Sequence, residues 1–100
     1  MKSFFGGTYV GKDTLANNNI YYPIRLEYYK TENIENYKSF YGIEVVKTEY
    51  KEDKVNVENK VIDKITDEEN TINKILEQFK LGEITPAVSE EMLEELLSKK

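Results

Sequence analysis

Hydrophobic and polar residues alternate along the chain from Ile20 to Tyr29. The apolar and aromatic residues fall on every second position, and these positions are Ile20, Tyr22, Ile24, Leu26 and Tyr28. A period of two is typical of a strand with one buried face, so the pattern predicts a strand here. Pro23 has no N–H to donate to a neighbouring strand, which places the predicted strand at a sheet edge or turns Pro23 toward solvent.

Two further runs have the same period. After a polar stretch at residues 31–37, alternating apolar residues predict a strand between Tyr41 and Tyr50. A charged turn at residues 51–54 separates it from a third run, in which Val55, Val57 and Val61 are spaced by twos. Strands joined by short connections predict an antiparallel meander, and residues 3–10 are a candidate fourth strand.

The hydrophobic period changes to that of a helix after Thr66. Thr66 and Glu69 have the spacing of a capping box, and the apolar residues that follow are spaced by three and four, namely Ile72, Ile75, Leu76 and Phe79. Gly82 stands where a left-handed residue commonly ends a helix, so the pattern predicts a helix over residues 67–81. Pro86 interrupts the helical pattern, and a second amphipathic helix is predicted to begin at Ser89 and to end near residue 98.

These elements predict one α+β domain that covers residues 1–100: an antiparallel β-meander of three to four strands with two C-terminal helices packed on one face. Residues 20–62 form the predicted sheet and residues 66–98 the two helices. Residues 1–19 are an N-terminal extension, or an extra strand followed by a loop. Residues 16–20 are polar and turn-forming, so we expect a mobile loop there.

The composition excludes most catalytic chemistries. The chain has no cysteine and no histidine, so it offers no thiolate nucleophile, no cysteine-ligated metal and no imidazole base. We therefore expect no catalytic residues, no metal site and no cofactor, and we expect that the protein is not an enzyme. No apolar run approaches the roughly 18 residues that span a bilayer, so we expect a cytoplasmic protein that does not bind membranes.

One motif is a near match to a phosphate-binding loop. Gly6, four further residues, Gly11 and Lys12 have the spacing of such a loop, but Asp13 stands where a Ser or Thr hydroxyl would hold magnesium. The residues that follow also lack the period of the helix that a phosphate loop opens. We expect the glycines, Gly7 included, to belong to a bent or bulged first strand, and the alternative is a phosphate- or nucleotide-binding protein.

The net charge of −5 lies in the second half of the chain, because basic and acidic residues balance over residues 1–50. The acids of interest line the predicted second helix and the turn before it, and they are Glu83, Glu90, Glu91, Glu94 and Glu95. A row of carboxylates can compete for the basic groove of a target protein. The alternative is a solvated helix face, in which the first glutamates complement the helix dipole.

Eleven of the twelve aromatic residues lie in the first half. Aromatic side chains on strands can stack on single-stranded nucleic acid, but the strands have no net charge and the chain has a single arginine, so we expect no direct nucleic-acid binding. Tyrosine fits half-buried strand positions and is also enriched in protein interfaces. Tyr21 and Tyr29 fall opposite the predicted buried face, and we expect them to contact a partner.

Three segments carry a family resemblance: IRLEYYKTE, FYGIEVVKTE with Tyr41, Gly42, Ile43 and Glu44, and the C-terminal helix followed by Ile84, Thr85, Pro86 and a short acidic helix. From about residue 24 to residue 98 the chain resembles an uncharacterised family of small clostridial and other Firmicutes proteins, a domain of unknown function. The resemblance implies the meander and its helices. It leaves out residues 1–19 and implies no activity, cofactor or site.

The sequence therefore favours a non-enzymatic module that binds a protein, as a small acidic regulator or inhibitor. Small acidic proteins are common on phage and mobile elements, so a host nucleic-acid enzyme such as a CRISPR effector is one expected target. The alternatives are the nucleotide-binding protein described above and a plain homodimer formed through a strand edge or through Leu96 and Leu97.

Overall fold

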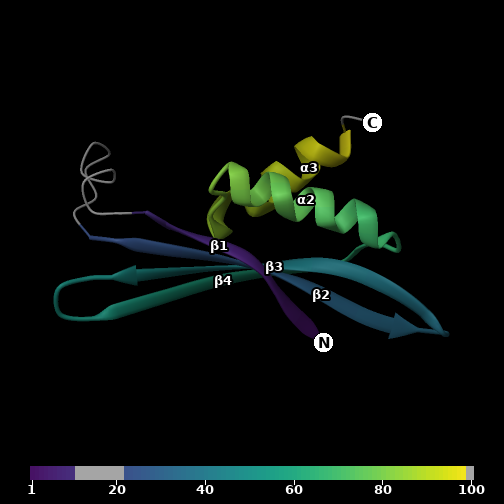
Figure 1. The fold of residues 1–100 in the computed structure, drawn as a ribbon, viewed down its shortest axis with the longest axis horizontal. Helices are drawn as coiled ribbons and strands as arrows, with labels where there is room; N and C mark the ends of the chain where they lie inside the picture. Colours follow the sequence, from purple (N-terminus) through teal and green to yellow (C-terminus); the bar gives the residue numbers. More distant parts are fainter. Residues whose placement is uncertain (11–21, 99–100) are drawn as a thin grey trace.

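The structure is a computed structural model that describes residues 1–10 and 22–98. Its four strands form one antiparallel sheet in chain order, and its helices follow (Figure 1). The strands are β1 (Lys2–Val10), β2 (Ile24–Glu35), β3 (Lys38–Tyr50) and β4 (Val55–Thr66), and the helical elements are α2 (Glu69–Leu81), the 3-10 turn η1 (Pro86–Val88) and α3 (Ser89–Ser98). The predicted α+β meander with two C-terminal helices is confirmed.

The candidate N-terminal strand is the fourth strand of the sheet. Lys2–Val10 pairs with β2 along its length, and the register shifts between Phe4 and Gly6. This shift is a bulge, as the glycines of the first strand predict. The predicted loop at residues 16–20, together with Gly11, Lys12 and Tyr21, lies outside the described residues.

Because β1 joins the sheet, β2 is an inner strand, so of the two alternatives predicted from Pro23 the edge position is wrong. Pro23 precedes the first residue of β2, so its missing N–H removes no hydrogen bond from the sheet. Its carbonyl oxygen accepts a hydrogen bond from the Tyr50 backbone N–H, with the nitrogen 3.0 Å away. A proline just outside a strand is compatible with an inner position.

The polar stretch at residues 31–37 is not a connection, because β2 continues through it to Glu35. Asn36 and Tyr37 alone join β2 to β3, and both have a left-handed backbone, with φ values of 51° and 64°. This is the two-residue turn that matches the twist of a hairpin. The polar residues of β2 have partners across the pair, as Ser39 Oγ donates to a Glu32 carboxylate oxygen at 2.7 Å. Polarity therefore does not end the strand.

The hydrophobic core lies between the sheet and the helices, which both lie on the same side of the sheet (Figure 1). The buried residues come from the two inner strands and from one face of each helix, and they are Ile24, Leu26, Tyr28, Ile43, Val45, Ile72, Ile75, Leu76, Phe79 and Leu93. The alternation that predicts a buried face on β2 is thus confirmed from Ile24 onward. The Tyr28 hydroxyl donates to the Ile84 carbonyl oxygen at 2.8 Å, which ties the sheet to the link between α2 and α3.

The ends of α2 differ from their predicted form. The capping box is absent: Thr66 Oγ1 accepts a hydrogen bond from the backbone N–H of Glu68 at 3.1 Å, and the helix begins at Glu69, two residues later than predicted. Gly82 has a right-handed backbone, with a φ of −85°. Glu83 takes the left-handed conformation instead, and the N–H groups of Glu83 and Ile84 bond back to the carbonyl groups of Lys80 and Phe79. This is a Schellman motif displaced by one residue from the glycine.

Gly42 lies where the backbone of β4 leaves no room for a side chain. The register between β3 and β4 shifts near this residue, and a Cβ atom at Gly42 would lie 2.3 Å from the Ile62 carbonyl oxygen. Such a separation is far inside van der Waals contact, so only glycine fits here. The bulge that presses against Gly42 contains Lys64, whose φ is 54°.

Candidate functional site: the open face of the sheet

Side chains on the two faces of the sheet alternate, so the register fixes which residues point away from the helices. We call this side the open face, because no described element covers it (Figure 1). Its larger apolar and aromatic residues come from all four strands, and they are Phe4, Tyr9, Tyr29, Phe40, Val46, Tyr50, Val55, Val57 and Val61. Phe4 is 58% exposed and Tyr9 is 63% exposed, so these side chains are presented to solvent.

An aromatic cluster occupies the β1 side of the open face. The rings of Phe4 and Tyr29 meet edge to face, with centroids 5.5 Å apart, and Lys2 Nζ lies 4.7 Å from the Tyr29 centroid. The Tyr29 hydroxyl donates to a Glu27 carboxylate oxygen at 3.1 Å. Burial, followed by this hydrogen bond, raises the pKa of Tyr29 above its ordinary value. The ring of Tyr29 is thus held in place by contacts on several sides.

A carboxylate lies at the centre of the open face. Glu44 is 8% exposed and accepts hydrogen bonds from Lys2 Nζ and Asn59 Nδ2, each at 2.9 Å. Burial acts to raise the pKa of Glu44, but the hydrogen bonds from Asn59 and Lys2 outweigh it, so the pKa lies below its ordinary value. Glu44 is therefore ionised at neutral pH with its donors in place, which suits a structural anchor better than a general acid or base.

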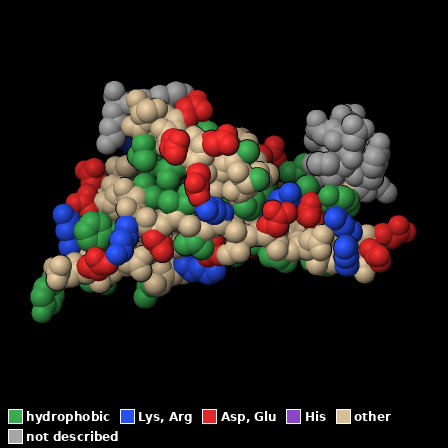
Figure 2. Space-filling view, turned by 180° about the vertical axis from the view of Figure 1, so that it is seen from behind, with side chains coloured by type: hydrophobic (Ala, Val, Ile, Leu, Met, Phe, Trp, Pro, Cys, Tyr) green, Lys and Arg blue, Asp and Glu red, His purple; other side chains and the backbone are tan. Residues whose placement is uncertain are grey.

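The structure gathers the predicted acidic residues on the helix side of the molecule. Glu90, Glu91, Glu94 and Glu95 are exposed on α3, and Glu83 is exposed in the turn after α2. Figure 2 shows acidic side chains gathered over the helix layer, while acidic and basic side chains are mixed along the sheet. Glu90 forms an ion pair with Lys60 of β4. Their role in partner binding stays a prediction.

Of the two tyrosines predicted to accompany these acids, Tyr29 does not lie near them. Tyr29 lies on the open face, on the opposite side of the sheet from α3, and it is half-buried. Tyr21 lies outside the described residues. A single flat partner cannot contact both Tyr29 and α3, because the sheet separates them.

The near match to a phosphate loop begins inside a strand. Gly6 lies in the middle of β1, where it pairs with Tyr28, and the Lys80 side chain of α2 lies beside it. Gly11 and Lys12 lie outside the described residues, so the full loop is not described. Among the residues that the structure describes, no group of three or more carboxylates is placed to hold a metal ion. Neither of the described helices is long and apolar enough to span a bilayer.

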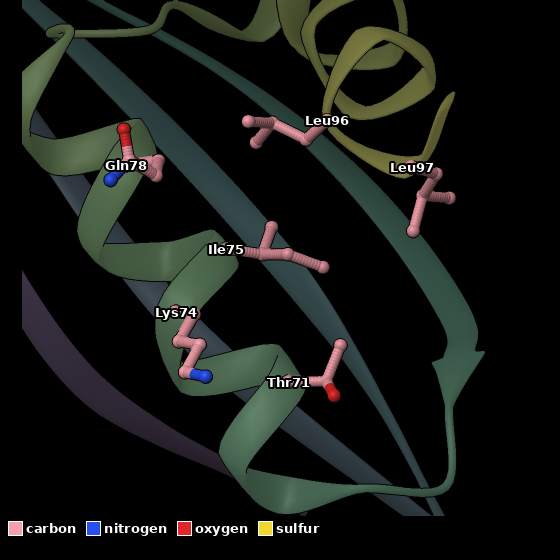
Figure 3. Close-up of a pocket in the computed structure, with 6 residues that line it drawn as sticks. All are labelled: Thr71, Lys74, Ile75, Gln78, Leu96 and Leu97. Carbon is pink, nitrogen blue, oxygen red and sulfur yellow. The ribbon is translucent and has the colours of Figure 1, made fainter. Parts of the chain in front are cut away.

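A hollow of about 200 Å³ lies between α2 and α3 (Figure 3). Ile75 of α2 and Leu96 and Leu97 of α3 point toward one another across it, and Thr71, Lys74 and Gln78 complete its lining. Ile75 is almost fully buried and Leu96 packs against the core, whereas Leu97 is exposed. The hollow is therefore a gap in the packing between the two helices, beside the core.

Sequence reasoning missed most of the open face. The valine spacing in β4 predicts the strand, but Val55, Val57 and Val61 point away from the core, and the pattern alone does not show this. Phe4 and Tyr9 belong to a strand that was only a candidate. The available signal was that both faces of the strands carry apolar residues, because helices packed on one face of a sheet leave the other face to solvent.

Comparisons with known proteins agree with the expectation of an uncharacterised family. The comparison with curated proteins and the comparison with solved structures returned no match. A family model described as a family of unknown function (DUF6514) matches residues 1–99, and this match extends beyond the resemblance at residues 24–98 to include β1. With its open sheet face and two C-terminal helices, the chain belongs to the family of unknown function DUF6514.

Proposed function

We propose that the protein is a non-catalytic binding module, a small acidic regulator or inhibitor of another protein, and that its partner docks on the open face of the sheet. The observation that carries the proposal is the exposure of Phe4, Tyr9 and the β4 valines on one side of the sheet. A sheet covered on one face normally has a polar outer face. An exposed apolar patch rimmed by polar residues is typical of a protein-binding site.

The arrangement of the open face supports a protein partner. Tyrosine supplies much of the binding energy at protein interfaces, because it buries a large rigid ring and keeps a polar group for a hydrogen bond. Tyr29 is already held by Phe4, Lys2 and Glu27, so binding would order it little further. The Glu44 carboxylate is matched by its donors within the chain, so docking does not have to leave it unpaired.

The charge distribution indicates the chemistry of the partner. The open face mixes Lys2 and Arg25 with Glu27 and Glu44, while the chain as a whole has a net charge of −5. We propose a partner with an apolar contact surface surrounded by basic residues, because the net negative charge of the chain would attract such a protein over longer distances. The narrower expectations of a CRISPR effector, a phage origin and a clostridial source stay predictions.

A matched pair of variants tests the proposal. Tyr9→Lys places a charge on the open face, and Leu81→Lys places one at the end of α2, where the side chain is 72% exposed and away from that face. Each protein is immobilised, extract from the source organism is passed over it, and bound proteins are quantified by mass spectrometry. We expect one captured protein to bind wild type and Leu81→Lys equally and to lose at least tenfold with Tyr9→Lys. Equal capture by Tyr9→Lys, or no protein captured by wild type, would overturn the proposal.

A further inference from the structure

The outer edge of β4 is available for pairing. The strands β1 and β4 are the edges of the sheet, and no strand of the described residues pairs with the outer row of backbone N–H and C=O groups of either. The two edges differ, because β1 is interrupted by its bulge between Phe4 and Gly6, whereas β4 pairs with β3 without a break from Val55 to Ile62. A regular edge of eight residues is a template for another strand.

The side chains of β4 are complementary to a second copy of the same strand. In an antiparallel pair centred on Asn59, Val57 lies opposite the partner's Val61 on the open face. On the helix face, Glu58 lies opposite the partner's Lys60. The twofold symmetry repeats both contacts, so the pair has two valine contacts and two contacts between opposite charges.

The neighbouring registers are unfavourable. Two residues opposite each other in an antiparallel pair point their backbone groups either both toward the partner strand or both away from it, so the register changes in steps of two residues. One step places Glu58 opposite the partner's Glu58, and the other places Lys60 opposite the partner's Lys60. Like charges directly opposite each other destabilise a pair. The sequence of β4 therefore selects the register centred on Asn59.

The monomer leaves these side chains accessible. Glu58 is more than half exposed, and its carboxylate lies 3.9 Å from Lys47 Nζ, a separation too long for a strong interaction. Lys60 forms an ion pair with Glu90 and remains 42% exposed. A hollow of about 350 Å³, lined in part by Lys60 and Ala87, lies beside the strand and leaves room next to the lysine.

From this complementarity we infer that the protein forms a homodimer through β4, with the two sheets continuous across the twofold axis. Pairing continues the sheet without turning it over, so the open faces of both subunits lie on the same side. The dimer then presents an open face of eight strands. This inference does not depend on the proposed partner, because Tyr9 lies on β1, at the opposite edge of each sheet.

Charge reversal tests the dimer. The variant Lys60→Glu places Glu58 opposite a glutamate, and Glu58→Lys places a lysine opposite Lys60, so each variant alone is expected to be a monomer in sedimentation equilibrium. Mixed in equal amounts, the two variants restore two contacts between opposite charges and are expected to form a heterodimer of twice the 11.7 kDa chain mass. Recovery on mixing also shows that both variants are folded. A wild-type protein that stays monomeric up to millimolar concentration, or variants that dimerise as well as wild type, would overturn the inference.

The register is tested separately, because the chain has no cysteine of its own. Asn59→Cys places two thiols directly opposite each other across the axis, within the separation that a disulfide needs. We expect Asn59→Cys to form a covalent dimer on mild oxidation and Val55→Cys, whose opposite residue is the partner's Asp63, to remain monomeric. Equal crosslinking of both variants would contradict the register.

Discussion

The turn between β2 and β3 is expected to limit the stability of the protein. Tyr37 has a φ of 64° and a fully exposed side chain, and it occupies the second position of a two-residue turn in which both residues are left-handed. Glycine is the residue preferred there, because it has no Cβ atom to clash with the carbonyl oxygen. The substitution Tyr37→Gly is therefore expected to stabilise the fold.

The size of the effect follows from two opposing terms. A left-handed backbone costs an L-residue about 1–2 kcal/mol, and Tyr37→Gly removes that cost. Glycine also gains conformational entropy in the unfolded chain, which offsets about 0.5–1 kcal/mol of the gain. Tyr37 is fully exposed, so little packing is lost with its ring. The midpoints of the two terms differ by about 0.75 kcal/mol, which is the expected net stabilisation and corresponds to a rise in Tm of about 3–6 °C for a domain of this size.

Urea unfolding monitored by circular dichroism measures this change, with Asn36→Gly as the matched control. Asparagine tolerates the left-handed conformation, so Asn36→Gly should change the unfolding midpoint little. The slope of the unfolding free energy against urea concentration should be the same in wild type and both variants, because the surface exposed on unfolding is unchanged. A Tyr37→Gly protein that is no more stable than wild type would refute the assignment of strain to Tyr37.

Four further predictions concern the core and the candidate surfaces. Tyr28→Phe removes a buried hydroxyl and leaves a carbonyl oxygen without its donor, so unfolding by urea should show a loss of about 1–3 kcal/mol; an unchanged midpoint would contradict that bond. The lowered pKa of Glu44 means that its stabilising contribution is present above its ordinary pKa of 4.5 and is lost as the pH falls through the lower folded value. The stability difference between wild type and Glu44→Gln should therefore be largest at neutral pH and shrink in acid, and a difference that grows in acid would reverse the argument. Glu91→Gln combined with Glu95→Gln should weaken binding of a captured partner and flatten its salt dependence if α3 contributes, whereas unchanged affinity would confine the site to the open face. Calorimetric titration with ATP and magnesium should show no saturable binding, and binding that is lost in Lys12→Ala would favour the nucleotide-binding alternative.

The sequence predicts the elements of this fold well where one period persists. The alternation in β2 and the helical spacing from Ile72 to Phe79 each arise because one face of an element is buried, and burial imposes a period that can be recognised without a structure. The same reasoning predicts β1 as a strand only weakly, because two glycines and a bulge interrupt the alternation of its residues. Periodicity therefore identifies the elements that form the core.

Other features depend on contacts that periodicity does not describe. Residues 31–35 belong to β2 because they pair with residues 38–42 of β3, and this pairing is known only once the register is known. Glu83 rather than Gly82 adopts the left-handed conformation, which depends on where the backbone hydrogen bonds of α2 end. Gly42 was visible as part of a family motif, but its reason is the close approach of the β4 bulge.

The candidate site was predicted only in part, for a related reason. The sequence identified Tyr29 as a residue of the outer face, since it alternates with the buried Tyr28. It could not show that Phe4 of β1 packs on Tyr29, or that Asn59 of β4 donates to Glu44 of β3, because the register that brings these residues together is not known from the sequence. The acids of α3 were found from their spacing, which says nothing of the side of the sheet on which they lie.

The central claim, that the open face binds the partner, is tested most directly by crosslinking in the source organism. A photoreactive phenylalanine analogue replaces Tyr9 on the open face or, in a matched protein, Leu81 at the end of α2. Irradiation of living cells, followed by mass spectrometry, then reports which position lies against another protein. The account predicts a covalent adduct with one partner protein from position 9 and none from position 81, whereas an adduct from position 81 alone, or from neither position, would contradict it.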